Sequence, residues 1–304
     1  MIRFDDRAAI VTGAGAGLGR AHALLLAARG AKVVVNDPGG SIDGTGGNGS
    51  AADGVVAEIK AAGGTAVANY ASVADRDGAA SIVQTALDSF GKVDIVVNNA
   101  GILRDKIFAK MTLDEFETVL AVHLLGTVYV TKAAWPHLLD QKYGRVVFTT
   151  SGSGLVGSYG QANYGAAKTA MMGLMNNLKF EGAKANIKVN MISPVAGTRM
   201  TEGIIDQKLF DLSKPERVSP AVAWLCSEEC DANGEIIAAG AGYFTLVKLM
   251  KTTGVVIDPA QTPTIEDFVI NKDKIFDLST ARAYSSTLDD ETKHALGLPG
   301  RSDN

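Results

Sequence analysis

The chain has 304 residues, a net charge of −4 and 46% hydrophobic residues, so it can bury a sizeable core and does not have a disordered composition. Its acidic balance argues against nucleic acid as the main partner, because phosphate contacts require a basic surface. No signal-like leader or apolar run of the roughly 18 residues that span a membrane is visible, and Cys226 and Cys230 lack a nearby histidine to complete a zinc site. We therefore expect a cytoplasmic protein with reduced thiols, no metal and no membrane partner.

Short apolar runs rich in β-branched residues alternate with long helical patterns along most of the chain. The runs show little polar alternation, which is typical of parallel strands covered by helices on both faces. This alternation predicts right-handed βαβ units and an α/β, doubly wound parallel sheet of the Rossmann type. The expected strands are 8–13, 31–37, 65–70, 93–101, 144–151, 185–193 and, as the last, 234–240; the expected early helices are 18–30, 50–62 and 75–90.

The last part of the chain breaks this rhythm. Residues 251–304 contain "DPAQTPTIEDF", carry more charge and show no obvious strand. We therefore expect a Rossmann-fold domain over 1–250. Residues 251–304 should form a C-terminal helical extension that packs on the core or on a partner subunit.

A glycine-rich segment, "VTGAGAGLGR", follows the first expected strand and opens the first helix. Gly13, Gly17 and Gly19 allow a tight turn that brings the helix N-terminus against a pyrophosphate. A glycine triplet alone is a weak signal, but here the strand and the helix that the motif requires are both expected. Asp37, at the end of the second strand, is placed to accept hydrogen bonds from ribose hydroxyls and to repel a 2′-phosphate, so NAD is favoured over NADP. The alternative is an ordinary turn residue before Pro38.

Tyr164 is the one tyrosine of the seven that has a lysine, Lys168, four residues later. This spacing places both side chains on one face of a helix. A phenolate at pH 7 costs about 4 kcal/mol, and a cation about 5 Å away recovers roughly 3 kcal/mol at an effective dielectric constant near 20. Lys168 together with an oxidised nicotinamide therefore places the phenol near working pH, whereas the alternative is a surface pair without function.

The motifs "TGAGAGLG", "NNAG" at 98–101, Ser151 and Tyr164-x-x-x-Lys168 resemble, over roughly residues 5–245, the short-chain dehydrogenase/reductase family. The resemblance implies that Tyr164 is the general acid/base, and that Lys168 lowers its pKa and binds the nicotinamide ribose. It further implies that Ser151 hydrogen-bonds the substrate oxygen and that Asn98 holds the strand beside the cofactor. The remaining cofactor contacts that it implies are Leu18, Ser72, Val73, Ala100, Gly101, Pro194 and Thr198.

Three positions depart from the common pattern of that family. His123, in "AVHLLG", stands where most members have an asparagine that supports a water in a proton relay; it either serves the relay or packs. The segment "SPVAGTRM" is one residue shorter than the usual loop over the nicotinamide, and Ser72 replaces a frequent adenine-binding aspartate.

A closer likeness appears in "VVNDPGG", "NNAGILRDK", "VHLLG", "GQANYGAAK" and "WLCSEEC", which resemble the dehydrogenase part of the peroxisomal multifunctional enzyme type 2 family, also called 17β-hydroxysteroid dehydrogenase type 4. That likeness implies NAD-dependent oxidation of (3R)-3-hydroxyacyl-CoA to 3-ketoacyl-CoA. A 17β-hydroxysteroid substrate is the alternative, and a nucleotide-binding scaffold without turnover is a third possibility. Arg104 and Lys106 are either contacts for acyl-CoA phosphates or solvated loop charges.

The expected setting of the protein follows from the same likeness. The chain leaves no room for a fused hydratase domain and ends in "GRSDN" rather than a peroxisomal tripeptide. We therefore expect a free-standing, cytoplasmic dehydrogenase. The family implies a homodimer in which the helix that carries Tyr164 pairs with its twin.

Overall fold

The computed structural model describes residues 1–47, 49–198, 206–284, 292–293 and 295–298. Its contacts divide the chain into two compact units, Met1–Leu246 and Val247–Asn304, and each unit is described by itself. The division lies four residues before the expected boundary at 250.

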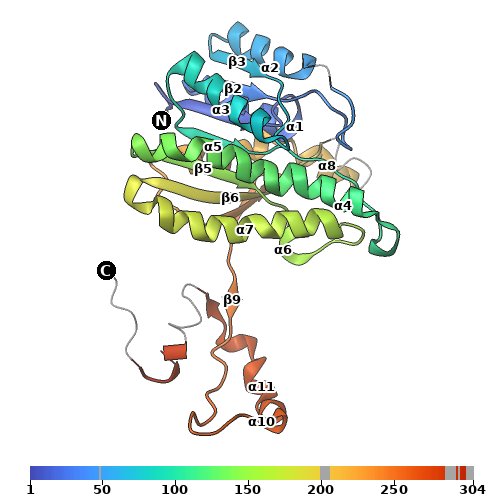
Figure 1. The fold of residues 1–304 in the computed structure, drawn as a ribbon, viewed down its shortest axis with the longest axis vertical. Helices are drawn as coiled ribbons and strands as arrows, with labels where there is room; N and C mark the ends of the chain where they lie inside the picture. The colour runs from blue at the N-terminus through green and yellow to red at the C-terminus, as the bar shows by residue number, and fades with distance from the viewer. Residues whose placement is uncertain (48, 199–205, 285–291, 294, 299–304) are drawn as a thin grey trace. The chain divides into compact units, whose positions relative to one another are not determined.

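The first unit is built on an eight-stranded sheet with the order β3-β2-β1-β4-β5-β6-β7-β8 (Figure 1). The first seven strands are parallel. The order reverses between β1 and β4, which is where doubly wound sheets bind their ligands. The predicted doubly wound sheet is therefore confirmed. The strands are β1 Ala8–Thr12, β2 Lys32–Asn36, β3 Thr65–Asn69, β4 Ile95–Asn98, β5 Gly144–Thr149, β6 Ile187–Val195, β7 Ile236–Gly240 and β8 Tyr243–Val247.

The prediction that 234–240 is the last strand is wrong, because β8 follows β7 after two residues. Ala241 and Gly242 have φ values of 51° and 86°, the left-handed pair that a tight hairpin requires. A two-residue connection joins antiparallel strands, so β8 runs against the rest of the sheet. Its side chains Tyr243, Phe244 and Leu246 are exposed, which weakens the hydrophobic signal by which buried strands are recognised.

Helices cover both faces of the sheet, as the pattern predicts. On one face α3 packs against α5 and α4 against α7, and Figure 1 shows α3, α5 and α7 lying across the sheet. On the other face α1 packs against α2 and α9. Between the layers lies a core in which β1, β4 and β5 are buried along their whole length. The helices are α1 Gly17–Ala28, α2 Ser50–Ala61, α3 Arg76–Phe90, α4 Leu113–Leu120, α5 Gly126–Asp140, α6 Gly152–Val156, α7 Ala162–Gly182, α8 Gln207–Leu212 and α9 Ser219–Cys226, with short turns η1 Phe108–Lys110, η3 Ala183–Ala185 and η4 Pro215–Arg217.

A π-helical turn, η2 (Ala121–Leu125), joins α4 to α5 without a break, so that Leu113–Asp140 is one helical segment. By length and composition this segment is apolar enough to cross a membrane. The core helix of a soluble protein passes the same test, and here the segment packs against α3 and α7.

The amino-terminal edge of the sheet carries a network of paired charges. Asp94, at 1% exposure, accepts hydrogen bonds from Arg7 (2.8 Å) and the Ala8 N–H (2.9 Å), and forms an ion pair with Lys92 (3.2 Å). Arg145 is equally buried, and its guanidinium donates to the carbonyl oxygens of Gly144, Asn186 and Ser227 at 2.8, 2.8 and 2.9 Å. The guanidinium carbons of Arg7 and Arg145 lie 3.6 and 4.4 Å from the centre of the Tyr143 ring.

The second unit is small and helical, as expected, with α10 Ile265–Ile270, α11 Lys272–Ile275 and η5 Leu278–Thr280. It also contains an antiparallel pair, β9 Met250–Lys251 and β10 Arg282–Ala283, which the sequence pattern does not predict. None of the described residues from 247 onward is buried, so this unit builds no core of its own there. Packing of the extension on the core or on a partner subunit stays a prediction.

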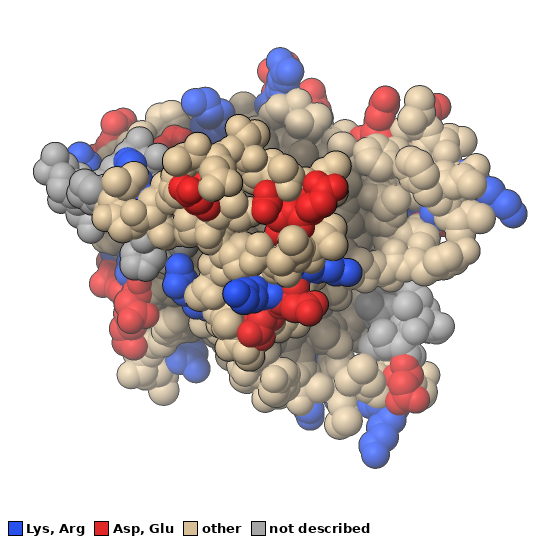
Figure 2. Space-filling model, turned by 90° about the horizontal axis from the view of Figure 1, so that it is seen from below, with Lys and Arg blue, Asp and Glu red and all other residues tan. Residues whose placement is uncertain are grey.

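Basic and acidic side chains of the described residues are intermixed on the face drawn in Figure 2.

Candidate active site

The glycine loop between β1 and α1 leaves no room for side chains. A Cβ on Gly13 would lie 2.8 Å from the Ala100 Cα, and one on Gly19 would overlap the Gly13 carbonyl oxygen. Gly13 and Gly17 also have φ values of 62° and 52°, which favour glycine. Gly17, Leu18 and Gly19 form the first turn of α1, and Ala16 at its N-cap has no side chain to satisfy the free N–H groups. The loop therefore fits a pyrophosphate at the helix N-terminus.

Two residues that sequence reasoning missed hold this loop against β4. The Thr12 hydroxyl accepts hydrogen bonds from the N–H groups of Asn99 (3.0 Å) and Ala100 (3.1 Å). The Asn99 amide donates to the carbonyl oxygens of Thr12 (3.0 Å) and Gly13 (3.1 Å). Asn98, which is expected to hold the strand beside the cofactor, is the last residue of β4 and donates to the Thr131 hydroxyl of α5 at 3.0 Å. The consecutive asparagines after a buried strand were the available signal for Asn99.

Asp37 lies directly beyond β2 and faces the glycine loop. Its two carboxylate oxygens accept the N–H groups of Gly15 (2.8 Å) and Gly39 (2.7 Å). These contacts fix the carboxylate, and each oxygen keeps a second lone pair that suits a ribose hydroxyl. A neighbouring hollow of about 500 Å³ carries a second carboxylate, Asp53, which accepts a hydrogen bond from the Tyr70 hydroxyl (2.5 Å).

The other predicted cofactor contacts lie at the same carboxyl edge of the sheet. The Ser72 hydroxyl, after β3, accepts the Ala74 N–H at 3.2 Å, and Val73 is buried. Pro194 is the penultimate residue of β6, and a Cβ on Gly17 would lie 3.4 Å from the Thr198 methyl group. The next part of that loop, 199–205, lies outside the described residues.

Four side chains from three segments of the chain meet beside the glycine loop. Ser151 is the N-cap of α6 beyond β5, Tyr164 and Lys168 are one turn apart on α7, and His123 lies in the π-turn η2. The Lys168 ammonium is 5.4 Å from the centre of the Tyr164 ring, and the His123 ring meets that ring edge-on with centroids 5.1 Å apart. The Ser151 hydroxyl acts on the Tyr164 phenol and lowers its pKa. The expected catalytic residues are thus neighbours in space.

Lys168 is buried, and its ammonium donates to the Thr149 carbonyl oxygen. No described carboxylate forms an ion pair with it, and burial lowers the pKa of Lys168 to about 7. Burial raises the pKa of Tyr164 above its ordinary value; the Ser151 hydrogen bond lowers it, and the negative charge of Asp105 raises it further. The phenol is therefore protonated until a further positive charge arrives.

His123 is held by backbone groups. Its Nε2 lies 3.0 Å from the Ile102 nitrogen and 2.8 Å from the Ile102 carbonyl oxygen, and its Nδ1 has no hydrogen-bond partner among the described residues. Burial, followed by the charge of Lys168, lowers the pKa of His123 well below its usual range, so the ring is neutral. A Cβ on Gly101 would overlap the ring, so His123 packs closely against that glycine. Its part in a proton relay stays a prediction.

A model of the family described as short chain dehydrogenase matches residues 7–208. The chain belongs to this family. The short-chain dehydrogenase is 52% identical over 278 residues to a short-chain type dehydrogenase/reductase of Mycobacterium tuberculosis, covering 91% of this chain and 96% of the relative. It is 49% identical over 281 residues to the peroxisomal multifunctional enzyme type 2 of Mus musculus, covering 92% of this chain but 38% of that enzyme.

Solved structures show the same relationship. Full-length peroxisomal multifunctional enzyme type 2 of Drosophila melanogaster is similar with a TM-score of 0.82 and 40% identity, over 97% of this short-chain dehydrogenase and 50% of that chain. A 7α-hydroxysteroid dehydrogenase complexed with NADH and 7-oxo glycochenodeoxycholic acid is similar with a TM-score of 0.71 and 28% identity, over 79% of this chain and 95% of that one. A hydroxyacyl-CoA dehydrogenase of Mycobacterium tuberculosis is 35% identical over 295 residues, 88% of this chain and 90% of the relative.

The loop charges of this short-chain dehydrogenase are engaged within the protein. Lys106 forms an ion pair with Glu115 at 2.6 Å, and Arg104 donates to the Asp43 carbonyl oxygen (3.0 Å) and the Thr118 hydroxyl (3.4 Å). Both cysteines are unpaired and buried, and the described part of the chain holds no group of three or more histidine, cysteine, aspartate or glutamate residues that suits a metal ion.

Proposed function

We propose that this short-chain dehydrogenase interconverts (3R)-3-hydroxyacyl-CoA and 3-ketoacyl-CoA with NAD. The observation that carries the proposal is the meeting of Ser151, Tyr164 and Lys168 beside the glycine loop and Asp37. The substrate class is supported by the similarity to a hydroxyacyl-CoA dehydrogenase and to peroxisomal multifunctional enzymes type 2.

The residues of the chain divide the reaction between them. NAD, which the glycine loop and Asp37 would hold, would supply the acceptor for the hydride of the alcohol carbon and a positive charge at the site. That charge and the Lys168 ammonium would lower the pKa of Tyr164, so that its deprotonated form, the phenolate, takes the hydroxyl proton of the alcohol. The Ser151 hydroxyl, which acts on Tyr164 from the N-cap of α6, stabilises the charge that develops on the substrate oxygen. In the reverse direction Tyr164 donates its proton to the ketone.

Replacing Tyr164 with phenylalanine tests the acid/base role. We expect Tyr164→Phe to lower kcat/KM for 3-hydroxyacyl-CoA oxidation by roughly 10² to 10⁴-fold, because the proton acceptor is lost while the ring still packs. The affinity for NAD, measured by fluorescence titration, should stay within about twofold. Tyr243→Phe, an exposed tyrosine on β8, serves as the matched control. Full activity of Tyr164→Phe would overturn the proposal.

The same assay separates the substrate classes. Wild-type kcat/KM for 3-hydroxyacyl-CoA should exceed that for estradiol or testosterone. A higher value for the steroid would move the assignment to a 17β-hydroxysteroid dehydrogenase, and no turnover of any secondary alcohol would leave a nucleotide-binding scaffold.

The NAD preference depends on Asp37. A 2′-phosphate next to this carboxylate would be repelled, and Asp53 in the adjoining hollow adds a second negative charge. We expect Asp37→Ala to reduce the ratio of kcat/KM for NAD to that for NADP by about tenfold or more, which corresponds to roughly 1.4 kcal/mol. An unchanged ratio would place the discrimination elsewhere.

We also propose a cytoplasmic homodimer. The large apolar side chain of Phe180 is exposed on α7, the helix along which we expect the two subunits to pair. Light scattering should give twice the chain mass of 31.6 kDa. Fractionation of the source cells should place the enzyme with soluble cytoplasmic proteins.

A further inference from the structure

The loop between β4 and η1 lies against the start of α7. The Asn163 amide donates to the Arg104 carbonyl oxygen at 3.0 Å, and the Lys106 N–H donates to the Gly160 carbonyl oxygen at 2.8 Å. Lys106 and Gln161 form a parallel β-bridge. These backbone contacts place Asp105, which lies between Arg104 and Lys106, next to the first turn of the helix that carries Tyr164.

A chain of two short hydrogen bonds starts from Asp105. Its Oδ2 accepts the Gln161 Nε2–H at 2.6 Å, and the Gln161 Oε1 accepts the Ser153 hydroxyl at 2.6 Å. Gln161 is the N-cap of α7, three residues before Tyr164, and Ser153 lies in α6, whose N-cap is Ser151. Asp105 is thereby tied to both segments that carry the hydroxyl groups of the site.

Among the described residues, few charged groups lie near Tyr164. Lys168 on α7 supplies the positive charge, and His123 from η2 is neutral. On the neighbouring loop and on α4, Arg104 donates to a backbone carbonyl and a hydroxyl, and Lys106 is paired with Glu115. Asp105 is exposed, and its negative charge raises the pKa of Tyr164 less than burial does.

We propose that Asp105, held by Gln161 and Ser153, is a positioning residue that sets the acidity of Tyr164 and so the pH at which oxidation and reduction exchange dominance. The proposal rests on the proposed role of Tyr164 as the acid/base. A fixed negative charge near the phenol opposes the phenolate, which Lys168 and the nicotinamide favour. It therefore keeps the proton on Tyr164 at neutral pH, where ketone reduction needs it, and moves alcohol oxidation to higher pH.

Asp105→Asn tests this idea, because an amide oxygen still accepts the Gln161 hydrogen bond while the charge is removed. For alcohol oxidation, kcat/KM rises with pH, and we expect the pH at the midpoint of this rise to be lower by roughly half a unit in the variant. At pH values below the midpoint, kcat/KM should therefore be about threefold higher than in the wild type. The falling limb for ketone reduction should move by the same amount. Difference absorbance of the tyrosinate, with Tyr164→Phe as the blank, should show the same shift without turnover.

Two further variants separate charge from structure. Gln161→Met removes the hydrogen bond that holds Asp105. We therefore expect a lower kcat, and a midpoint of the oxidation profile that lies at lower pH, as in Asp105→Asn. Asp140→Asn, an exposed carboxylate at the end of α5, removes an equal charge and should leave both limbs in place. If Tyr164→Phe is inactive but Asp105→Asn leaves the limbs and the tyrosinate titration unmoved, the role of Asp105 is overturned and the proposed function stands. If Tyr164→Phe is active, the proposed function fails.

Discussion

Buried charged side chains have different surroundings at the two edges of the central sheet, where the strands begin (the amino-terminal edge) and where they end (the carboxyl edge). At the amino-terminal edge Asp94 has three partners, and Arg145 donates to three carbonyl oxygens beside a tyrosine ring. At the carboxyl edge Lys168 is just as buried, but its partner is a single carbonyl oxygen. A buried charge that has few hydrogen-bonding or charged partners is costly, so natural proteins keep one where its chemistry is needed. The comparison separates an edge that stabilises the fold from an edge that performs the reaction.

The largest contrast is expected from Lys168→Met. Its folded pKa of about 7 lies below the ordinary 10.5, so between these values the unfolded chain binds more protons and the free energy of unfolding rises with pH. Below pH 7 Lys168 is charged in the folded state, and the full cost of burying the ammonium is subtracted from the free energy of unfolding. Removing it should raise the free energy of unfolding at pH 6 by roughly 2 kcal/mol, after allowing for the unpaired Thr149 carbonyl, while kcat/KM falls roughly 10² to 10⁴-fold. Urea denaturation and steady-state kinetics check both; a destabilised variant would contradict the comparison.

At the opposite edge, Asp94→Asn should have the reverse effect on stability. The amide can still accept the Ala8 N–H, but Arg7 and Lys92 lose their buried negative partner. We expect a loss of about 3 kcal/mol in the free energy of unfolding, with kcat/KM unchanged. Urea denaturation measures the loss, and Asp140→Asn, an exposed carboxylate, should change it by less than about 0.5 kcal/mol. Equal effects of the two variants would remove the distinction between the edges.

A smaller effect is expected from His22, in the core between α1 and α9. Its Nδ1 lies 2.8 Å from the Ser219 hydroxyl, and burial lowers its pKa to about 3. Between pH 6.5 and pH 3 the unfolded chain therefore holds the extra proton, so stability is lost as the pH falls through this window. The loss due to His22 should reach about 2 kcal/mol at pH 5, and His22→Leu should make the melting temperature less dependent on pH between 7 and 5. Parallel curves for the variant and the wild type would exclude this residue as a source of acid lability.

Residues 8–13, the glycine loop and the Tyr164–Lys168 pair could be predicted because each signal is local in the sequence. Apolar runs, glycines that need positive φ, and a spacing of one helical turn are all read within about ten residues. β8 was missed because its side chains are exposed, and the Asp105–Gln161 contact because it joins residues 56 positions apart. Such a contact depends on which loops the sheet order brings together.

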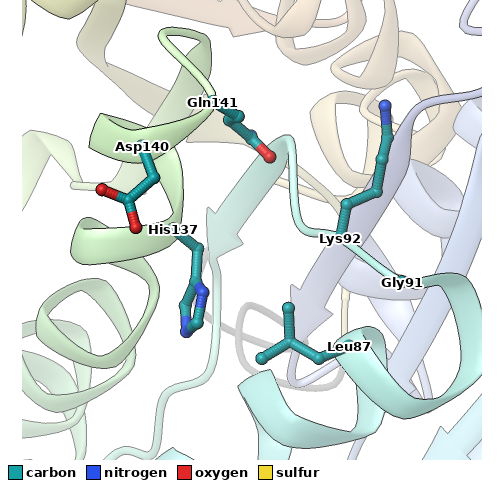
Figure 3. A pocket seen from close by; sticks show the side chains of 6 residues that line it. All are labelled: Leu87, Gly91, Lys92, His137, Asp140 and Gln141. Atoms are coloured by element: carbon teal, nitrogen blue, oxygen red, sulfur yellow. The ribbon is translucent and has the colours of Figure 1, made fainter.

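Other site residues could not be predicted because their hydrogen-bonding groups are common in many structural settings. Thr12 and Asn99 carry no charge and match no rule of spacing, yet they tie the glycine loop to β4. The hollow of about 310 Å³ lined by Leu87, Lys92 and His137 follows from no sequence signal either; Figure 3 shows Leu87 and His137 on its two sides, with the Lys92 ammonium pointing away.

The π-helical turn at Ala121–Leu125 acts as a phase shift within a continuous helix. Each residue of an α-helix advances the direction of the side chains by about 100°. The extra residue in the π-helical turn therefore rotates the side chains of α5 relative to those of α4. Deleting one residue there would relax the turn to ordinary pitch and swing the imidazole away from Gly101. The number of residues in this segment therefore matters as much as their identity. We expect the fold to tolerate substitutions here far better than a one-residue deletion.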